Sequence, residues 1–218
     1  MRAKNSILQG QRQPFEPFNT DKLFSICREE AVALCQSLVH THGDDMIYAA
    51  SLCVDSDVST VFPAVNSPGR LRELTERQER SDAQHRARLH DLMQRAGRDP
   101  FKIPDRREQR ADATKWYPGD WVSQLDRSVQ FPNTNAALAG ARGRPGETRE
   151  EFLARKTTKV ETLTRALAAA RDECLPRADV TVFVCIMDAE AGELKIMLDA
   201  AAGFNTPENH AALVRGLR

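Results

Sequence analysis

The chain has 218 residues and a mass of 24.4 kDa, and its 31 Lys and Arg residues balance its 31 Asp and Glu residues. Nucleic-acid binders usually carry a basic excess, so the zero net charge argues against general binding to DNA or RNA. With 41% hydrophobic residues, the chain is large enough to bury a core without a disulfide or metal staple. No apolar run approaches the roughly 18 residues of a membrane span, so we expect no membrane association and a cytoplasmic location.

Residues 1–18 lack the continuous apolar segment of a signal peptide, and we expect a flexible arm there, followed by a single domain over residues 19–218. The chain has five cysteines and no Cys-x-x-Cys motif. Four of them sit inside apolar runs: Cys27, Cys35, Cys53 and Cys185. This usage predicts small buried thiols in a reducing compartment and not a disulfide framework. We also expect no metal site and no cofactor.

The first predicted elements are a helix and a β-hairpin. Apolar residues recur at helical spacing over residues 20–40. The apolar runs 46–54 and 58–65 flank a tight Asp-Ser-Asp turn, which predicts two paired strands. Because a proline cannot donate a ladder hydrogen bond, Pro63 predicts that the second strand lies at a sheet edge or carries a bulge.

Residues 68–112 are predicted to be a charged, partly exposed helical insertion. The apolar stripe of the helix over residues 68–96 is thin, and its middle, residues 78–88, is almost wholly polar. A helix without an apolar middle has nothing to bury there. We therefore expect residues 78–88 to project from the domain or to be mobile. The charged residues 98–112, punctuated by prolines, are expected to be a connection.

The stretch TKWYPGDW, residues 114–121, holds both tryptophans and one of the two tyrosines. Pro118 and the glycine after it suit a turn, which can fold the two indoles onto one patch. Such aromatic residues serve either as structural anchors or as partner contacts. Trp121 is predicted to be buried, and Asp120 could bond an indole N–H or a backbone amide. Trp116 and Tyr117 are the candidates for an exposed ring.

The C-terminal half predicts a further strand between helices. Residues 137–147 are small and predict a mobile loop, and residues 148–174 show helical periodicity. The β-branched run 180–187 is typical of a central strand that is buried on both faces. Residues 190–202 and 207–217 predict two short helices. The fold class that follows is α+β, with helices packed against a mixed or antiparallel sheet.

Candidate catalytic groups are few. Asp55, Asp57 and Asp188 follow predicted strands, where catalytic carboxylates often lie, although aspartate also favours turns. His40 and His42 could bind a metal, but histidines also suit a helix C-terminus. Phosphate-binding loops, nucleophile elbows and zinc-protease helices are all missing from the sequence. These observations favour a protein that is not an enzyme.

Three short motifs follow one another along the chain. Their residues are Thr60, Val61, Pro63, Ala64 and Asn66, then Trp116, Pro118, Asp120 and Trp121, and finally Asp188 after the run 180–187. Together they resemble the bacterial family named domain of unknown function 4303, in which a Thr-Val-x-Pro-Ala-x-Asn segment is followed by a Trp-x-Pro-x-Glu-Trp motif and by a late strand that ends in Asp. The resemblance covers about residues 20–205. Asp120 replaces the usual glutamate, and Lys115 stands where arginine is common.

The resemblance implies an immunity protein that binds and neutralises a toxin encoded nearby, in a polymorphic-toxin or type VI secretion system. Its expected partner contacts are Trp116, Tyr117, Asp120, Arg77, Arg80 and Arg88, while Trp121, Pro118, Pro63, Asn66 and Asp188 are expected to be structural. Two alternatives remain: a small enzyme that uses the strand-end aspartates, and a non-catalytic adaptor. The sequence does not indicate an oligomeric state.

Overall fold

The computed structural model describes residues 18–42, 47–97, 115–121, 131–141, 143, 146–175 and 179–217. Its helices and strands are α1 (Thr20–His42), β1 (Ala49–Val54), β2 (Val61–Asn66), α2 (Pro68–Arg95), η2 (Pro118–Asp120), α4 (Pro132–Gly140), α5 (Arg149–Cys174), β3 (Thr181–Ile186), α6 (Ala191–Ala202) and α7 (Pro207–Leu217). The expected N-terminal arm, apart from its last residue, and the expected connection 98–112 lie outside the described residues.

The three strands form one mixed sheet in the order β2-β1-β3. β1 pairs with β2 as an antiparallel hairpin and with β3 in parallel, so the predicted hairpin and the α+β class are confirmed. Pro63 of β2 lies opposite Leu52 of β1. β2 is an edge strand, where the missing N–H of a proline is tolerated.

The prediction that residues 180–187 form the central strand is wrong, because β1 holds that position and β3 is the other edge. All six residues of β3 are nevertheless buried. β3 is covered on both faces, and an edge strand covered in this way is as apolar as a central one. The apolar run therefore reports burial of the faces and not the place of the strand in the sheet.

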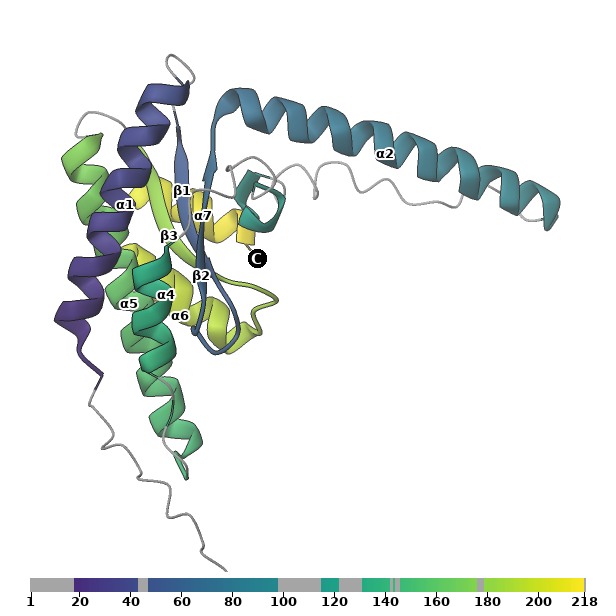
Figure 1. The fold of residues 1–218 in the computed structure, drawn as a ribbon. Helices are drawn as coiled ribbons and strands as arrows, with labels where there is room; N and C mark the ends of the chain where they lie inside the picture. Colours follow the sequence, from purple (N-terminus) through teal and green to yellow (C-terminus); the bar gives the residue numbers. More distant parts are fainter. Residues whose placement is uncertain are drawn as a thin grey trace, which may run out of the picture.

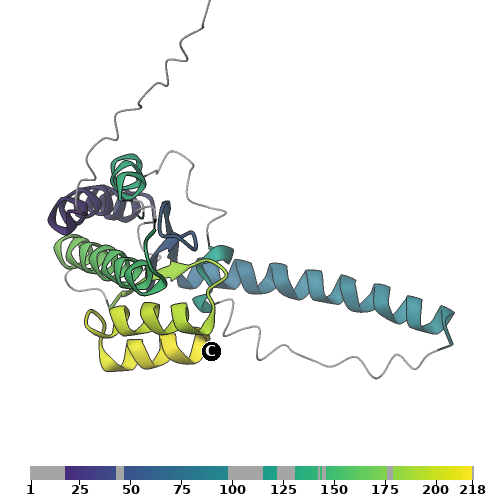
Figure 2. The same ribbon diagram turned by 90° about the horizontal axis from the view of Figure 1, so that it is seen from below.

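α5 is the central helix beside this sheet, with α1 and α4 on one side of it and α6 and α7 on the other (Figures 1 and 2). It begins with a capping box, in which Thr148 and Glu151 satisfy each other's backbone N–H groups. Ten of its side chains are buried, and it contacts α1, α6 and two of the strands. α6 and α7 pack against each other and against β3, and Figure 2 shows them side by side next to α5.

The mobile loop predicted over residues 137–147 is wrong in its first part, because α4 extends to Gly140. Pro132 occupies the first turn of α4, where its missing N–H is harmless. The Glu30 carboxylate of α1 then accepts the backbone N–H groups of Asn133 and Thr134, at 2.9 and 3.0 Å. A residue about a hundred positions away thus caps this helix, which no local pattern reveals.

α2 leaves the domain as a single long helix (Figure 1). It begins at the cap Ser67, whose hydroxyl accepts the Arg70 N–H, and Pro68 stands in the first turn. Leu74, near its base, is its buried residue. The polar residues 78–88 project from the domain, in agreement with their composition.

Candidate functional site

Trp121 anchors the aromatic stretch to one face of the sheet. It is 1% exposed, and its ring packs edge-on against Phe183 of β3, with 6.0 Å between ring centroids. In the sheet register Phe183 lies beside Ser51, so both side chains point to the same face. β1 places only small residues on that face, namely Ala49, Ser51 and Cys53. Their small volume leaves room for an indole.

Trp116 is also a core residue. It is 5% exposed and packs edge-on against Tyr48, with 6.0 Å between ring centroids. Lys115 lies over both rings, and its backbone carbonyl accepts the Tyr48 hydroxyl at 3.3 Å. α7 approaches so closely that a Cβ on Gly216 would lie 1.9 Å from Trp116 Cδ1. The expected contact of Trp116 with a partner is therefore corrected, because its ring does not reach the surface.

Tyr117 is the ring of this stretch that does reach the surface, with 36% of the residue exposed. Its ring folds over Gly119, where a Cβ would lie 2.5 Å from the Tyr117 Cε1 atom. Pro118 is buried and opens the η2 turn. The side chain of Asp120 lies outside the described part of the chain. The stretch is thus mainly a clasp on the sheet, with Tyr117 as its outer surface.

Asn66 joins β2 to the base of α2. It is 1% exposed, its carbonyl accepts the Tyr48 N–H, and its side-chain oxygen accepts the Ser67 N–H at 3.0 Å. Because Ser67 is the cap of α2, Asn66 fixes the point at which the projecting helix leaves the sheet. Its expected structural role therefore has a definite form.

The three arginines expected to contact a partner lie together on α2. Arg77 and Arg88 are eleven positions apart, which is about three helical turns, and Arg80 adjoins Arg77 at a spacing of three. All three are exposed. Arg80 forms an ion pair with Glu76, with 3.8 Å between Nη1 and Oε2. An exposed pair of this kind contributes about 0–1 kcal/mol, so the arginine can exchange its partner at little cost.

Asp55 organises the loop between β1 and β2. Its carboxylate accepts the N–H and hydroxyl of Ser59, at 2.7 and 2.6 Å, and the hydroxyl of Thr60 at 2.9 Å. Burial alone would raise the pKa of Asp55, but these hydrogen bonds outweigh burial and lower it. Val58, in the same loop, has φ +50°, which is unusual and strained for a β-branched residue.

A buried lysine holds this strained loop. Lys159 of α5 is 1% exposed and donates to the Val58 carbonyl at 3.0 Å. Burial, reinforced by the neighbouring Arg155 guanidinium, lowers the pKa of Lys159 to about 8. Arg155 itself makes two hydrogen bonds to Glu147, at 2.9 and 2.7 Å. Lys159 and Arg155 are therefore both engaged with groups of the protein itself.

The strand-end aspartates lie in the turns that follow β1 and β3. The Asp55 carboxylate is engaged with its own loop, and Asp57 is exposed. Asp188 has φ +56° and ends β3 at the turn into α6, a conformation that aspartate tolerates better than most residues. In the part of the chain that the structure describes, no three His, Cys, Asp or Glu side chains gather as metal ligands. The side chains of His40 and His42 lie outside it.

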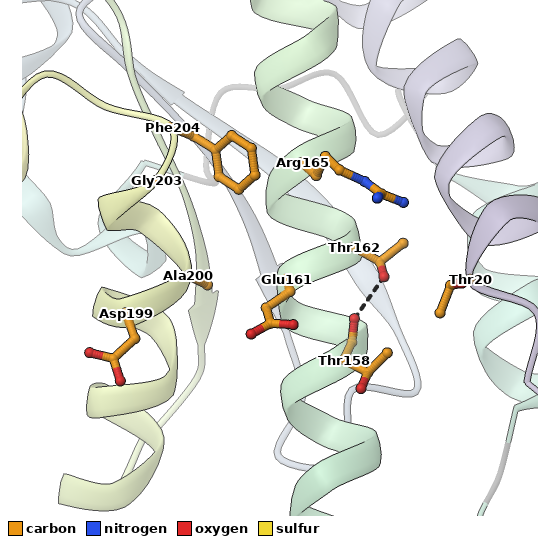
Figure 3. A pocket seen from close by; sticks show the side chains of 9 residues that line it. All are labelled: Thr20, Thr158, Glu161, Thr162, Arg165, Asp199, Ala200, Gly203 and Phe204. Carbon is orange, nitrogen blue, oxygen red and sulfur yellow. Dashed lines mark hydrogen bonds between the residues drawn. The ribbon is translucent and has the colours of Figure 1, made fainter.

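A hollow of about 450 Å³ lies between α1, α5 and α6 (Figure 3). Its polar groups are largely engaged. The Thr162 hydroxyl donates to the Thr158 carbonyl at 2.7 Å, and Asp199 is paired with Lys195. Arg165 stacks on the Phe24 ring, with 4.5 Å from its Cζ to the ring centroid. Glu161 of α5 also lines the hollow.

Sequence reasoning missed the buried cations of α5. Lys156 is 3% exposed and pairs with Glu193 of α6, and Lys159 holds the β1–β2 loop. A signal was present, because both lysines fall four and seven positions after Phe152, on the apolar stripe of the helix. It also missed the exposed Leu92 near the far end of α2.

Comparison with known proteins identifies one relationship. The family model described as domain of unknown function (DUF4303) matches residues 28–206, which is most of the chain and includes the clasp. No curated protein and no solved structure matches the chain. Among the described helices, none is long and apolar enough to cross a membrane.

Proposed function

The chain belongs to the DUF4303 family, and we propose that it is an immunity protein that binds and neutralises a cognate toxin encoded beside it. The toxin belongs to a polymorphic-toxin or type VI secretion system, and the immunity protein acts in the cytoplasm. It carries no turnover of its own. The two arguments for this proposal are what the resemblance to the family implies and the form of α2.

The observation that carries the proposal is the projection of α2. It is a 28-residue helix with Leu74 as its buried residue, and it stands clear of the sheet and of the helices around it. At 1.5 Å per residue it extends for about 42 Å. A helix held away from its own core offers side chains to another molecule on several faces. Its exposed charges can steer association and select a partner.

Chemistry at the strand ends has weaker support. An enzyme needs groups that are free to act on a substrate. The Asp55 carboxylate holds Ser59 and Thr60, and Lys159 holds the carbonyl of Val58. Both groups thus serve the loop between β1 and β2. We therefore rank the enzyme second and keep it as one outcome of the test.

The test is co-expression of this chain with the neighbouring toxin in a sensitive host, followed by co-purification. Rescue of growth together with a one-to-one complex supports the proposal. Rescue without a physical complex supports an enzyme that reverses the damage done by the toxin. A neighbouring product that is harmless and does not bind contradicts the proposal.

A matched pair of variants tests the contact surface. The first replaces Arg77, Arg80 and Arg88 by Glu, and the second makes the same change at three exposed cations elsewhere, Lys22, Arg149 and Lys195. Both variants change the net charge by the same amount. Loss of binding and rescue in the first variant alone supports α2 as the contact. Equal loss in both variants attributes binding to net charge.

A further inference from the structure

The far end of α2 differs in composition from its base. Leu89, Leu92 and Met93 stand at the spacing i, i+3, i+4, which places them on one side of the helix. Leu92 is 51% exposed, and Leu89 and Met93 are only partly buried. They lie near the end of α2 that points away from the domain (Figures 1 and 2). An isolated polar helix has no structural need for apolar residues there.

Positive charge is concentrated at the same end. Residues 70–82 contain four arginines and four acidic residues, so the base of α2 is balanced. Residues 83–95 contain three arginines and one acidic residue, a formal charge of +2. Asp91, the acidic residue, is already paired with Arg95, with 2.9 Å between Oδ2 and Nη2. The excess charge of the helix therefore lies at its far end.

The apolar and basic groups adjoin one another. Arg86 precedes Leu89 by three positions, and Arg88 precedes Leu92 by four, so an arginine flanks the apolar group on either side. A central apolar anchor surrounded by polar and arginine contacts is typical of the energetic centre of a protein interface. Phosphate contacts on a nucleic acid need the arginines but have no use for an exposed leucine.

We propose that residues 83–95 of α2 dock into an acidic-rimmed apolar socket on a protein partner, with Leu92 as the anchor and Arg88 as a flanking charge. This inference rests on the proposed function, because the partner is the toxin, and it names the surface chemistry that the toxin presents. The arginines select an acidic rim, since like charges facing each other across an interface are unfavourable. Leu92 supplies the buried apolar contact.

The probe is the purified toxin domain from the neighbouring reading frame, titrated calorimetrically against the full-length chain. The variants are Leu92→Ser and Arg88→Glu. Leu153→Ser is the matched control for the leucine, because Leu153 is 38% exposed on α5, and Arg149→Glu is the control for the charge. We expect each α2 variant to weaken binding by about tenfold or more, as for an interface anchor, and each control to stay within about twofold.

The outcomes are separable. If the wild-type chain binds and Leu92→Ser stays within about twofold of it, the docking inference is overturned while the immunity function stands. If the wild-type chain does not bind at all, the proposed function fails, and the docking inference with it. A parallel titration with a duplex DNA covers the remaining case. DNA binding that Arg88→Glu abolishes and Leu92→Ser leaves unchanged would overturn the protein socket.

Discussion

α2 and α5 are helices of nearly equal length, 28 and 26 residues, with opposite environments. Both begin at a hydroxyl cap, Ser67 in one and Thr148 in the other. α5 buries ten side chains, two of them lysines, whereas α2 buries Leu74. Lys159 of α5 is thus buried inside the protein, whereas Leu92 of α2 is exposed at its surface.

This contrast shows that helix formation and helix burial have different causes. Caps and helical propensity favour a helix, and both segments have them. The surroundings decide whether the helix packs into the core or stands at the surface. α5 is held by α1, α6 and the sheet, and its buried lysines Lys156 and Lys159 are paired inside the protein. α2 is held at its base, so its outer side chains stay available.

The largest expected effect concerns Trp121, in the aromatic stretch that follows α2 in the chain. We expect Trp121→Ala to lower the free energy of unfolding by about 3–5 kcal/mol, because the indole is buried against Phe183. Urea denaturation measures this loss. A variant whose unfolding midpoint in urea equals that of the wild type would mean that the clasp is no more important to the fold than the outer part of α2.

Two leucines compare the helices directly. Leu163→Ala on α5 removes a side chain that is 0% exposed and should cost about 2–5 kcal/mol of stability. Leu92→Ala on α2 removes one that is 51% exposed and should change stability by no more than about 0.5 kcal/mol. Urea denaturation of both variants measures the two losses in the free energy of unfolding. Similar losses at the two sites would contradict the assignment of α2 to the surface.

The buried lysine sharpens the comparison through pH. The pKa of Lys159 is about 8 in the folded chain and about 10.5 in the unfolded chain. Between these values the unfolded chain binds more protons, so this group makes stability rise with pH. Relative to Lys159→Met, the wild type should gain roughly 2 kcal/mol between pH 7.5 and pH 10.

The difference between the two proteins is the quantity to measure, by urea denaturation at both pH values with reductant present. Burial raises the pKa of the Cys27 thiol and of the Tyr48 hydroxyl, so these groups make the free energy of unfolding fall as the pH rises. The fall is the same in the wild type and in Lys159→Met, so it cancels in the difference between them. Lys195→Met is the control, since Lys195 is exposed. A difference that does not change with pH would show that Lys159 titrates normally.

The smallest effect is local. α2 between residues 76 and 92 is supported by pairs such as Arg80 with Glu76 and Gln78 with Asp82, each worth about 0.2–0.5 kcal/mol. Its amide hydrogens should therefore exchange far faster than those of the buried part of α5. Hydrogen exchange read by mass spectrometry compares the two helices in one sample. Equal protection would mean that α2 is held along its whole length.

Much of the candidate contact surface could be anticipated from composition. The polar middle of residues 78–88 predicts the projection, and the placing of Arg77 and Arg88 on one side follows from helical geometry alone. Trp116 could not be placed in this way. Its burial depends on Tyr48 and Gly216, which are distant in the chain. A tryptophan beside a turn suits a core or an interface equally well.

The sequence by itself determined the local features of this protein: the helical periods, the hairpin, the restriction of Pro63 to an edge or a bulge, and the burial of Trp121. Each depends on residues close together in the chain or on the size of one side chain. The tertiary structure alone decided that β1 is central, that Glu30 caps α4 and that Lys159 holds Val58. These depend on strand register and on contacts between segments far apart in sequence, because burial and pairing are properties of the neighbours that a residue acquires only on folding.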